Sequence, residues 1–128
     1  MNNRYTLGIE LGSTRIKAVL IDENAAVTAQ GSYEWENVLT DGLWSYPIHL
    51  VTEGVQAAYA ALAADFLSKT GETLTELAAI GISAMMHGYL AFDKEDRLLV
   101  PFRTWRNTSA AAAAAELSEA LNFHIPTR

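Results

Sequence analysis

Hydrophobic and polar positions alternate along residues 5–11, and a second short apolar segment follows at 16–22. The first segment has the two-residue period of a half-buried β-strand. The second is rich in Ile, Val and Leu, which strands favour. A small polar connection containing Gly12 separates them, so the pattern predicts a β-hairpin.

The same alternation returns from Val27 to Trp35 and predicts a third strand. Three sequential strands with short links form an antiparallel meander. The next residues, 37–46, are irregular, with Asp41 and Gly42 as a turn signal. We expect the bulky Trp44 and Tyr46 of this segment to be exposed.

From Pro47 the period changes to three and four residues, which predicts a long helix that Gly71 ends. Lys69 in its last turn supports that end. The stripe expected to face the core consists of Ile48, Val51, Val55, Tyr59, Leu62 and Phe66.

Shorter elements are predicted after this helix. Residues 72–77 suit a further turn of helix, and 78–85, apolar throughout, suit a buried strand. A strand pair is expected at 89–92 and 97–100 around a polar turn, and 101–107 reads as a loop or short strand. The order of these predicted strands and helices along the chain indicates an α/β sandwich with a mixed sheet.

Six consecutive alanines, 110–115, predict a final helix. Thr108 or Ser109 is expected to cap its start. Leu117 and Leu121 are four residues apart and therefore share a helix face, which we expect to pack against the sheet.

The composition narrows the classes of function. With 128 residues the chain suits one hydrophobic core, and its net charge of −6 argues against a nucleic-acid partner. Cysteine is absent, so disulfide and thiolate chemistry are excluded. No apolar run approaches a membrane span, and the start lacks a signal-peptide pattern. We therefore expect a cytoplasmic protein without membrane contact.

The connection of the predicted hairpin carries phosphate-binding chemistry. Gly12, Ser13 and Thr14 offer successive amides and two hydroxyls, and Gly permits close approach of a phosphate oxygen. Glu10 could hold a magnesium ion beside it, and Lys17 returns on the second strand. The alternative is an ordinary hairpin with a solvated carboxylate.

Two further clusters suit a polyhydroxylated ligand. Met86, His87 and Gly88 follow the expected buried strand, at the carboxyl end where α/β sheets bind ligands. His87 can hydrogen-bond hydroxyls, and the alternative is a structural histidine hydrogen-bonded to the backbone. In the second cluster, 102–108, Trp105 can stack on a sugar while Arg106 and Asn107 bind its hydroxyls. A surface Arg–Trp contact with Asn in a turn is the alternative.

Together these three clusters resemble the N-terminal part of the FGGY family of carbohydrate kinases. Within the family, their sequences are most similar to those of pentulose kinases such as xylulokinase and ribulokinase. Residues 8–14 with Lys17 resemble the family's first phosphate motif. Residues 81–88 resemble its Gly-x-Ser-x-Gln-Met-His-Gly stretch, and 105–108 its Trp-Asn-Asp-x-Arg segment. The resemblance covers essentially the whole chain.

The resemblance implies a ribonuclease-H-like fold of the actin and hexokinase type, and an ATP-dependent kinase that phosphorylates a pentulose-like sugar. ATP and Mg²⁺ would be the cofactors, with Glu10 near the metal and Gly12, Ser13, Thr14 and Lys17 at the phosphates. Met86, His87, Gly88, Trp105, Arg106 and Asn107 would line the sugar pocket. A homodimer is a candidate assembly.

Three positions depart from the family pattern: Glu10 replaces Asp, Met85 replaces Gln, and Ser109 stands where Arg is usual. The family's catalytic Asp base and adenosine-binding second domain lie downstream, and the turn residues Asp93 and Asp96 are poor substitutes. We therefore expect residues 1–128 to be the N-terminal portion of the first, sugar-binding domain, without turnover alone. Two alternatives stay open: a non-catalytic actin-like binding or regulatory module, and a kinase for another polyol such as glycerol or rhamnulose.

Overall fold

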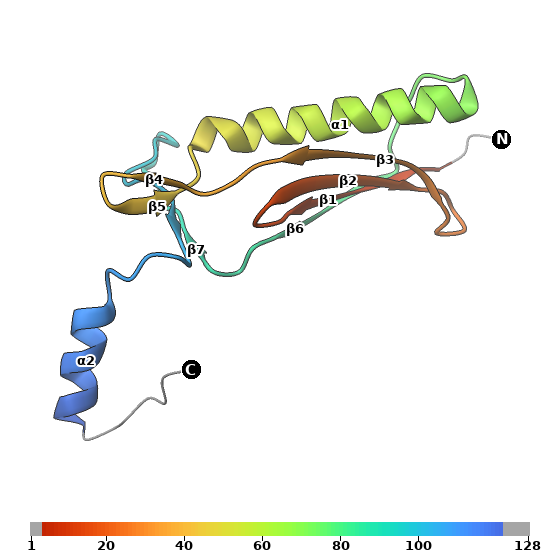
Figure 1. Ribbon diagram of the computed structural model, residues 1–128. Helices are drawn as coiled ribbons and strands as arrows, with labels where there is room; N and C mark the ends of the chain where they lie inside the picture. Colours follow the sequence, from red (N-terminus) through yellow and green to blue (C-terminus); the bar gives the residue numbers. More distant parts are fainter. Residues whose placement is uncertain (1–3, 122–128) are drawn as a thin grey trace.

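A computed structural model of the chain describes residues 4–121. Its main body has two layers, a four-stranded mixed sheet in the order β3-β2-β1-β6 and a long helix, α1, across one face (Figure 1). The bounds of these elements are β1 Thr6–Leu11, β2 Arg15–Ile21, β3 Val27–Glu34, α1 Ile48–Thr70 and β6 Ala79–Ala84. A mixed sheet with a helix layer confirms the predicted α/β class.

The antiparallel meander is confirmed. β1 pairs with β2 and β2 with β3, both antiparallel, and Leu7 lies opposite Leu20 in the first pair. Ile16, Ala18 and Leu20 of β2 are buried under α1, while the residues between them face away. Burial along β2 therefore alternates between the two faces of the sheet, with the two-residue period of a strand.

The helix α1 begins after Pro47 and ends at Gly71, as predicted. Gly71 has a left-handed backbone (φ 75°), and its N–H donates to the Leu67 carbonyl, closing the last turn. The helix buries Gly54, Ala58, Leu62 and Phe66. Ile48, expected in the core, is 40% exposed at the open first turn.

The strand β6 lies parallel to β1 at the sheet's edge among the described residues. The strand is confirmed, but its expected burial is wrong, because all six of its residues are exposed. The helix covers β3 and β2 and does not reach β6, so Ile82 remains 71% exposed. An apolar strand signals burial in a complete sheet, and residues 4–121 supply no cover for it.

Two small hairpins extend the structure. β4 (Val38–Thr40) pairs with β5 (Leu43–Ser45) across the predicted Asp41-Gly42 turn, whose residues both have positive φ. β7 (Gly88–Tyr89) pairs with β8 (Arg103–Thr104). The strand pair expected at 89–92 and 97–100 was wrong in extent, because only a bridge between Phe92 and Leu98 forms there.

Tyr46 is 1% exposed, so the prediction that it lies on the surface was wrong. Its ring packs between Trp35 and Phe102, and its hydroxyl is hydrogen-bonded. Trp44, also expected on the surface, is half-buried. A segment without hydrophobic period gives no sign of which aromatic side chain turns inward.

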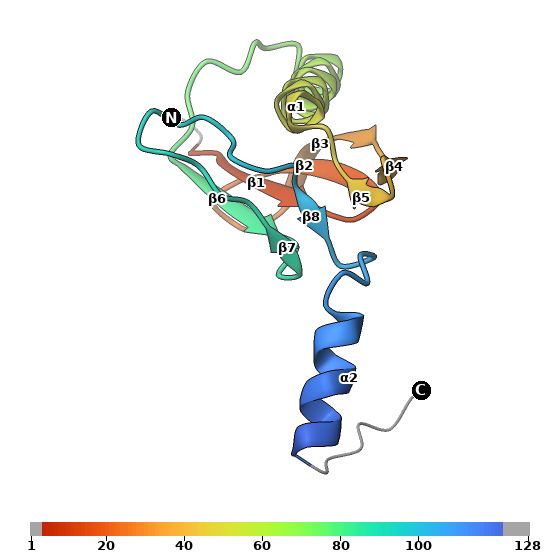
Figure 2. The same ribbon diagram turned by 90° about the vertical axis from the view of Figure 1, so that its left-hand side faces the viewer.

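The last helix, α2 (Ala111–Ala120), projects away from the sheet (Figures 1 and 2). The expected packing of Leu117 and Leu121 is wrong, since both are at least 60% exposed. Ala110 is the N-cap residue and no side chain caps the helix, so the predicted Thr108 or Ser109 cap is wrong as well. The helical turn expected at 72–77 is irregular chain. No helix within residues 4–121 is long and apolar enough to cross a membrane.

Candidate functional site

The turn at residues 12–14 joins β1 to β2, and its carbonyl groups are all engaged. The Gly12 carbonyl accepts a hydrogen bond from Trp35 Nε1 (2.7 Å), and the Thr14 carbonyl accepts one from the Trp35 backbone N–H (3.1 Å). The Tyr46 hydroxyl donates to the Ser13 carbonyl. Three successive carbonyl groups are thus held by two buried aromatic residues.

The amides of the same turn are in the opposite situation. Gly12 N–H donates to the Arg15 carbonyl (3.0 Å) and tightens the loop. Within residues 4–121, the N–H groups of Ser13 and Thr14 have no hydrogen-bond acceptor, and both residues are exposed. Unpaired amides beside two hydroxyls are the groups that an anion-binding turn requires. Phosphate binding by Ser13 and Thr14 stays a prediction.

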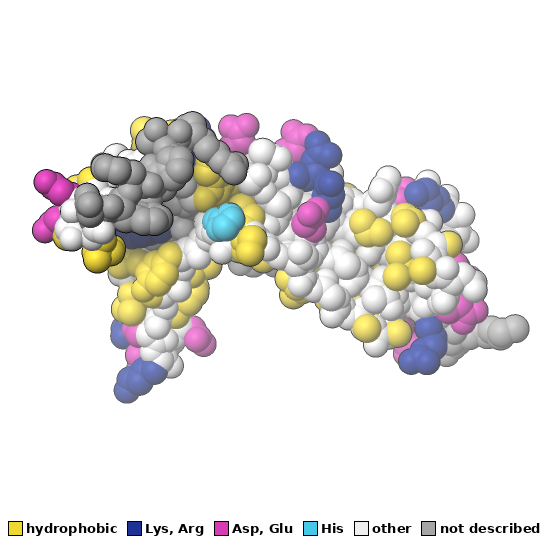
Figure 3. All heavy atoms as spheres, turned by 90° about the horizontal axis from the view of Figure 1, so that it is seen from below, with side chains coloured by type: hydrophobic (Ala, Val, Ile, Leu, Met, Phe, Trp, Pro, Cys, Tyr) yellow, Lys and Arg dark blue, Asp and Glu magenta, His cyan; other side chains and the backbone are white. Residues whose placement is uncertain are grey.

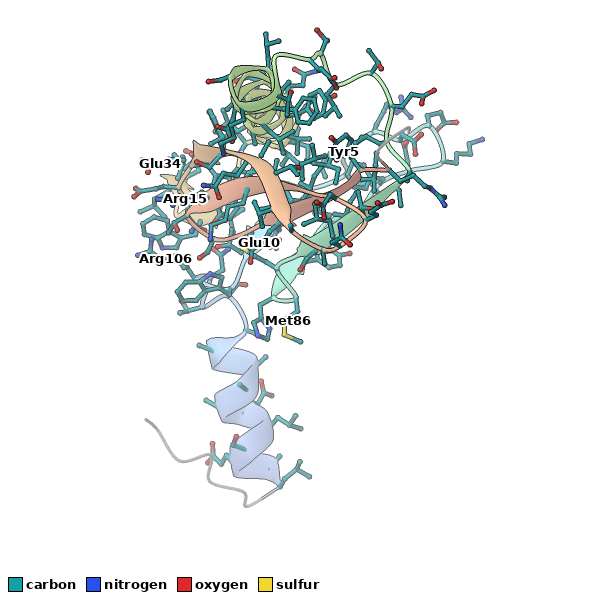
Figure 4. All side chains as sticks on the ribbon, turned by 90° about the vertical axis from the view of Figure 1, so that its right-hand side faces the viewer. Tyr5, Glu10, Arg15, Glu34, Met86 and Arg106 are labelled. Atoms are coloured by element: carbon teal, nitrogen blue, oxygen red, sulfur yellow. The ribbon has the colours of Figure 1, made fainter. Side chains whose placement is uncertain are left out.

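Glu10 and Lys17 lie opposite each other on β1 and β2, with 3.9 Å between Oε2 and Nζ. Both side chains are about half exposed, so this ion pair contributes little to stability. Ser83 of β6 is the neighbour of Glu10 on the other side. Figure 4 shows Glu10 on the sheet, away from α1.

A shallow, open hollow of about 430 Å³ lies on this part of the sheet, lined by Glu10, Lys17, Ser83 and the small residues Gly8 and Gly81. It belongs to the sheet face turned away from α1, and Figure 3 views the molecule from that side. Glycine and serine leave room there for a ligand next to the carboxylate and the ammonium group.

The described residues hold no group of three or more His, Cys, Asp or Glu side chains suited to a metal. Glu10 is thus a single carboxylate beside the unpaired amides of the 12–14 turn. That donor set fits Mg²⁺, which uses one or two carboxylates together with substrate phosphates and water. It does not fit a metal that requires a complete protein cage.

The two predicted sugar-side segments, Met86–Gly88 and Trp105–Asn107, lie close together. The pairing of β7 with β8 places Gly88 opposite Thr104, directly before Trp105. Met86 is 85% exposed and points away from the sheet beyond the end of β6 (Figure 4). His87 is exposed as well, so neither side chain is committed to the core.

The three residues of the second segment differ in what they contact. Asn107 binds the Trp44 backbone at both ends: its Oδ1 accepts from the Trp44 N–H (2.8 Å) and its Nδ2 donates to the Trp44 carbonyl (2.7 Å). The Arg106 guanidinium lies 3.9 Å from the Trp44 ring centre. Trp105 is 60% exposed and available for stacking.

Sequence reasoning missed the residues that support the turn: Trp35 and Tyr46, with Phe102 behind them. The ring centres are 4.3 Å apart for Trp35 and Tyr46, and 5.5 Å apart for Tyr46 and Phe102. Burial raises the pKa of Tyr46 above its usual value of 10.0, so its hydroxyl stays protonated. Trp35 was expected only as a strand residue, Tyr46 only on the surface, and Phe102 only as the first residue of the 102–108 cluster.

Residues 5–125 match the N-terminal domain of the FGGY family of carbohydrate kinases. Among curated relatives, gluconokinase of Bacillus subtilis is 28% identical over 121 residues, covering 94% of this chain and 22% of its own length. Xylulose kinase of the same organism is 24% identical, covering 95% and 24% respectively. The chain thus spans about a quarter of the length of these relatives.

Solved structures support the same assignment. A structure titled as a xyloylose kinase from Brucella ovis superposes with a TM-score of 0.76 at 28% identity, over 93% of this chain and 24% of that one. Gluconate kinase from Lactobacillus acidophilus gives 0.71 at 24% identity, over 95% and 23%. These neighbours confirm the predicted actin- and hexokinase-type fold. The chain therefore belongs to the FGGY family of carbohydrate kinases, through the match of residues 5–125 to the family's N-terminal domain.

Proposed function

We propose that this chain supplies the phosphate-binding turn and part of the sugar pocket of an ATP-dependent carbohydrate kinase. The observation that carries the proposal is the 12–14 turn, whose carbonyls are held while the Ser13 and Thr14 amides stay unpaired. Phosphoryl transfer depends mainly on positioning and on stabilising developing negative charge. A turn with fixed carbonyls and unpaired amides meets both requirements.

The residues around the turn divide this work. The N–H groups of Ser13 and Thr14 would donate to phosphate oxygens, Gly12 permits their close approach, and Lys17 adds positive charge. Glu10 would hold Mg²⁺, which neutralises phosphate charge when bound. Because Glu is one methylene longer than Asp, this carboxylate reaches further from β1 than the usual family residue.

On the sugar side, His87 and Trp105 have the most accessible chemistry. His87 offers ring nitrogens to hydroxyl groups, and Trp105 offers a stacking face. Met86 and Gly88 shape the wall beside them. Arg106 and Asn107 support this side of the pocket, because their contacts with Trp44 hold the segment 105–107 in place.

The substrate we propose is a small polyhydroxylated molecule of the carbohydrate class, with a pentulose as the first candidate. Similarity to a xylulose kinase supports a pentulose as the substrate, whereas similarity to a gluconokinase supports a sugar acid. A glycerol kinase from Burkholderia cenocepacia is 25% identical over 95 residues, so a simpler polyol such as glycerol is an alternative substrate.

Residues 1–128 form, in this proposal, the N-terminal portion of the sugar-binding domain in a longer kinase. The general base and the adenosine site would come from the remainder. Asp93 is not a candidate base, because its carboxylate accepts from the Arg97 guanidinium and from the backbone N–H groups of Glu95 and Arg97. These bonds lower the pKa of Asp93, the backbone N–H of Arg97 contributing most. A cytoplasmic location and a homodimer remain predictions of the same account.

The test measures ADP formation by the complete protein that contains this domain. It is supplied with Mg²⁺-ATP and, separately, D-xylulose, D-gluconate and glycerol. We expect ADP release that depends on one of these compounds, and its loss in His87→Ala and Trp105→Ala. Absence of release with all three, together with unchanged sugar binding in both variants, would favour a non-catalytic binding module.

A further inference from the structure

Trp35, Tyr46 and Phe102 form a buried stack, here called the aromatic column. Each of the three residues is at most 8% exposed. Tyr46 is the middle member, with Trp35 on one side and Phe102 on the other. Trp35 directly follows β3, Tyr46 directly follows β5 and Phe102 directly precedes β8, so the column joins segments far apart in the sequence.

One end of the column holds the 12–14 turn. Trp35 binds the Gly12 and Thr14 carbonyls, and Tyr46 binds the Ser13 carbonyl between them. Asn37 Nδ2 donates to the Tyr46 hydroxyl oxygen (3.1 Å). Because this oxygen already accepts from Asn37, its own proton is directed to Ser13.

The other end holds the sugar-side segments. The Phe102 ring lies so close to Gly88 that a Cβ atom there would approach it to 2.5 Å. Asn107 binds both backbone groups of Trp44, two residues before Tyr46. A shift of either sugar-side segment would therefore displace the column or the chain beside it.

We propose that Tyr46 is a positioning residue that fixes the phosphate-binding turn relative to the sugar-side segments, through its hydroxyl toward Ser13 and its ring against Phe102. The inference rests on the proposed kinase function. It separates two roles within one side chain, because the hydroxyl acts on the turn while the ring supports the sugar side.

The test uses Tyr46→Phe in the complete kinase, since this change removes the hydroxyl and keeps the ring. Tyr59→Phe is the matched control, removing a hydroxyl from a half-buried tyrosine of α1. For Tyr46→Phe we expect kcat/KM for Mg²⁺-ATP to fall about five- to tenfold, as for one lost hydrogen bond. The KM for the sugar should change less than twofold, and the control should match the wild type.

Trp35→Phe provides a second variant in case Tyr46→Phe fails to fold, because it removes the donor to Gly12 through a different side chain. The same split between ATP and sugar parameters is expected. Phe102→Leu should show the reverse, a raised sugar KM with a smaller effect on ATP.

The outcomes separate the two proposals. Wild-type protein without kinase activity contradicts the proposed function. Active wild type, with both Tyr46→Phe and Trp35→Phe equal to the Tyr59→Phe control, overturns the positioning role and leaves the function standing. Equal losses in ATP and sugar parameters also overturn it, since they indicate general loosening of the fold.

Discussion

The contact between α1 and β3 is so close at Gly31 that Gly31→Ala should disrupt the fold. A Cβ atom at this position would lie 2.2 Å from the Ala58 carbonyl oxygen and 2.4 Å from the Leu62 nitrogen. Ordinary contacts begin at 3.4 Å, so the methyl group lacks about 1.2 Å of space. Both neighbouring atoms belong to the backbone, so a side-chain rotation cannot relieve the clash.

The loss of stability in Gly31→Ala depends on which parts of the structure must move to relieve the clash. Overpacking a core costs about 1–3 kcal/mol when side chains can adjust. Here the whole helix must lift from the sheet, which weakens the packing of buried Leu62 and Ala58 as well. We therefore expect a loss of about 3 kcal/mol, corresponding to a fall in Tm of about 10 °C.

The assay is thermal and urea unfolding of the chain, followed by far-UV circular dichroism and tryptophan fluorescence. Gly81→Ala is the matched control, since a Cβ there meets nothing within 4 Å on the exposed strand β6. Its Tm should equal or slightly exceed that of the wild type, because Gly weakens a strand interior. Equal Tm values for the two variants would refute the close packing of α1 on β3.

Three further predictions concern stability. Ile16→Ala in the core should cost about 2–5 kcal/mol in urea unfolding, whereas Ile82→Ala on exposed β6 should cost less than about 1 kcal/mol; similar losses would contradict the assigned burial. Lys69 and the Gln30 backbone N–H lower the pKa of Asp65, so its stabilising effect is present above pH 3.8 and disappears as the pH falls through the lowered pKa. Asp65→Asn should therefore reduce stability at pH 6 and lose its effect near pH 2, and a pH-independent difference would oppose this reasoning. Burial raises the pKa of Tyr46, so its contribution is complete below pH 10.0 and declines as the pH rises toward the raised pKa; Tyr46→Phe should flatten that alkaline decline, measured by urea unfolding from pH 8 to 11.

The local elements could be predicted where period and turn chemistry agree. The meander, the extent of α1 and its end at Gly71 all follow from alternation, a three- and four-residue stripe and a left-handed glycine. Burial was harder to predict, as β6 and Leu117 show. Their apolar sequences suit a covered surface, and the described part of the chain provides none.

The candidate site also has residues that the sequence could predict and residues that it could not. The glycine, the hydroxyl residues and the flanking charges of the 12–14 turn are visible as a motif, because ligand chemistry demands those residue types at that spacing. The supports Trp35, Tyr46 and Phe102 are not visible, because they act through tertiary packing between segments up to 67 positions apart. Asn107 combines both aspects, since its motif predicts a ligand contact while its amide binds the Trp44 backbone.

The central claim is that the unpaired amides of the 12–14 turn bind the phosphates transferred by a carbohydrate kinase. The most direct measurement is sugar-dependent ADP release by the complete protein, compared between the wild type and Ser13→Pro, which removes one of the two amides. We expect release with D-xylulose or a related polyol, and a fall of at least tenfold in the variant while its Tm stays close to the wild type. Undiminished release by a folded Ser13→Pro variant would contradict it.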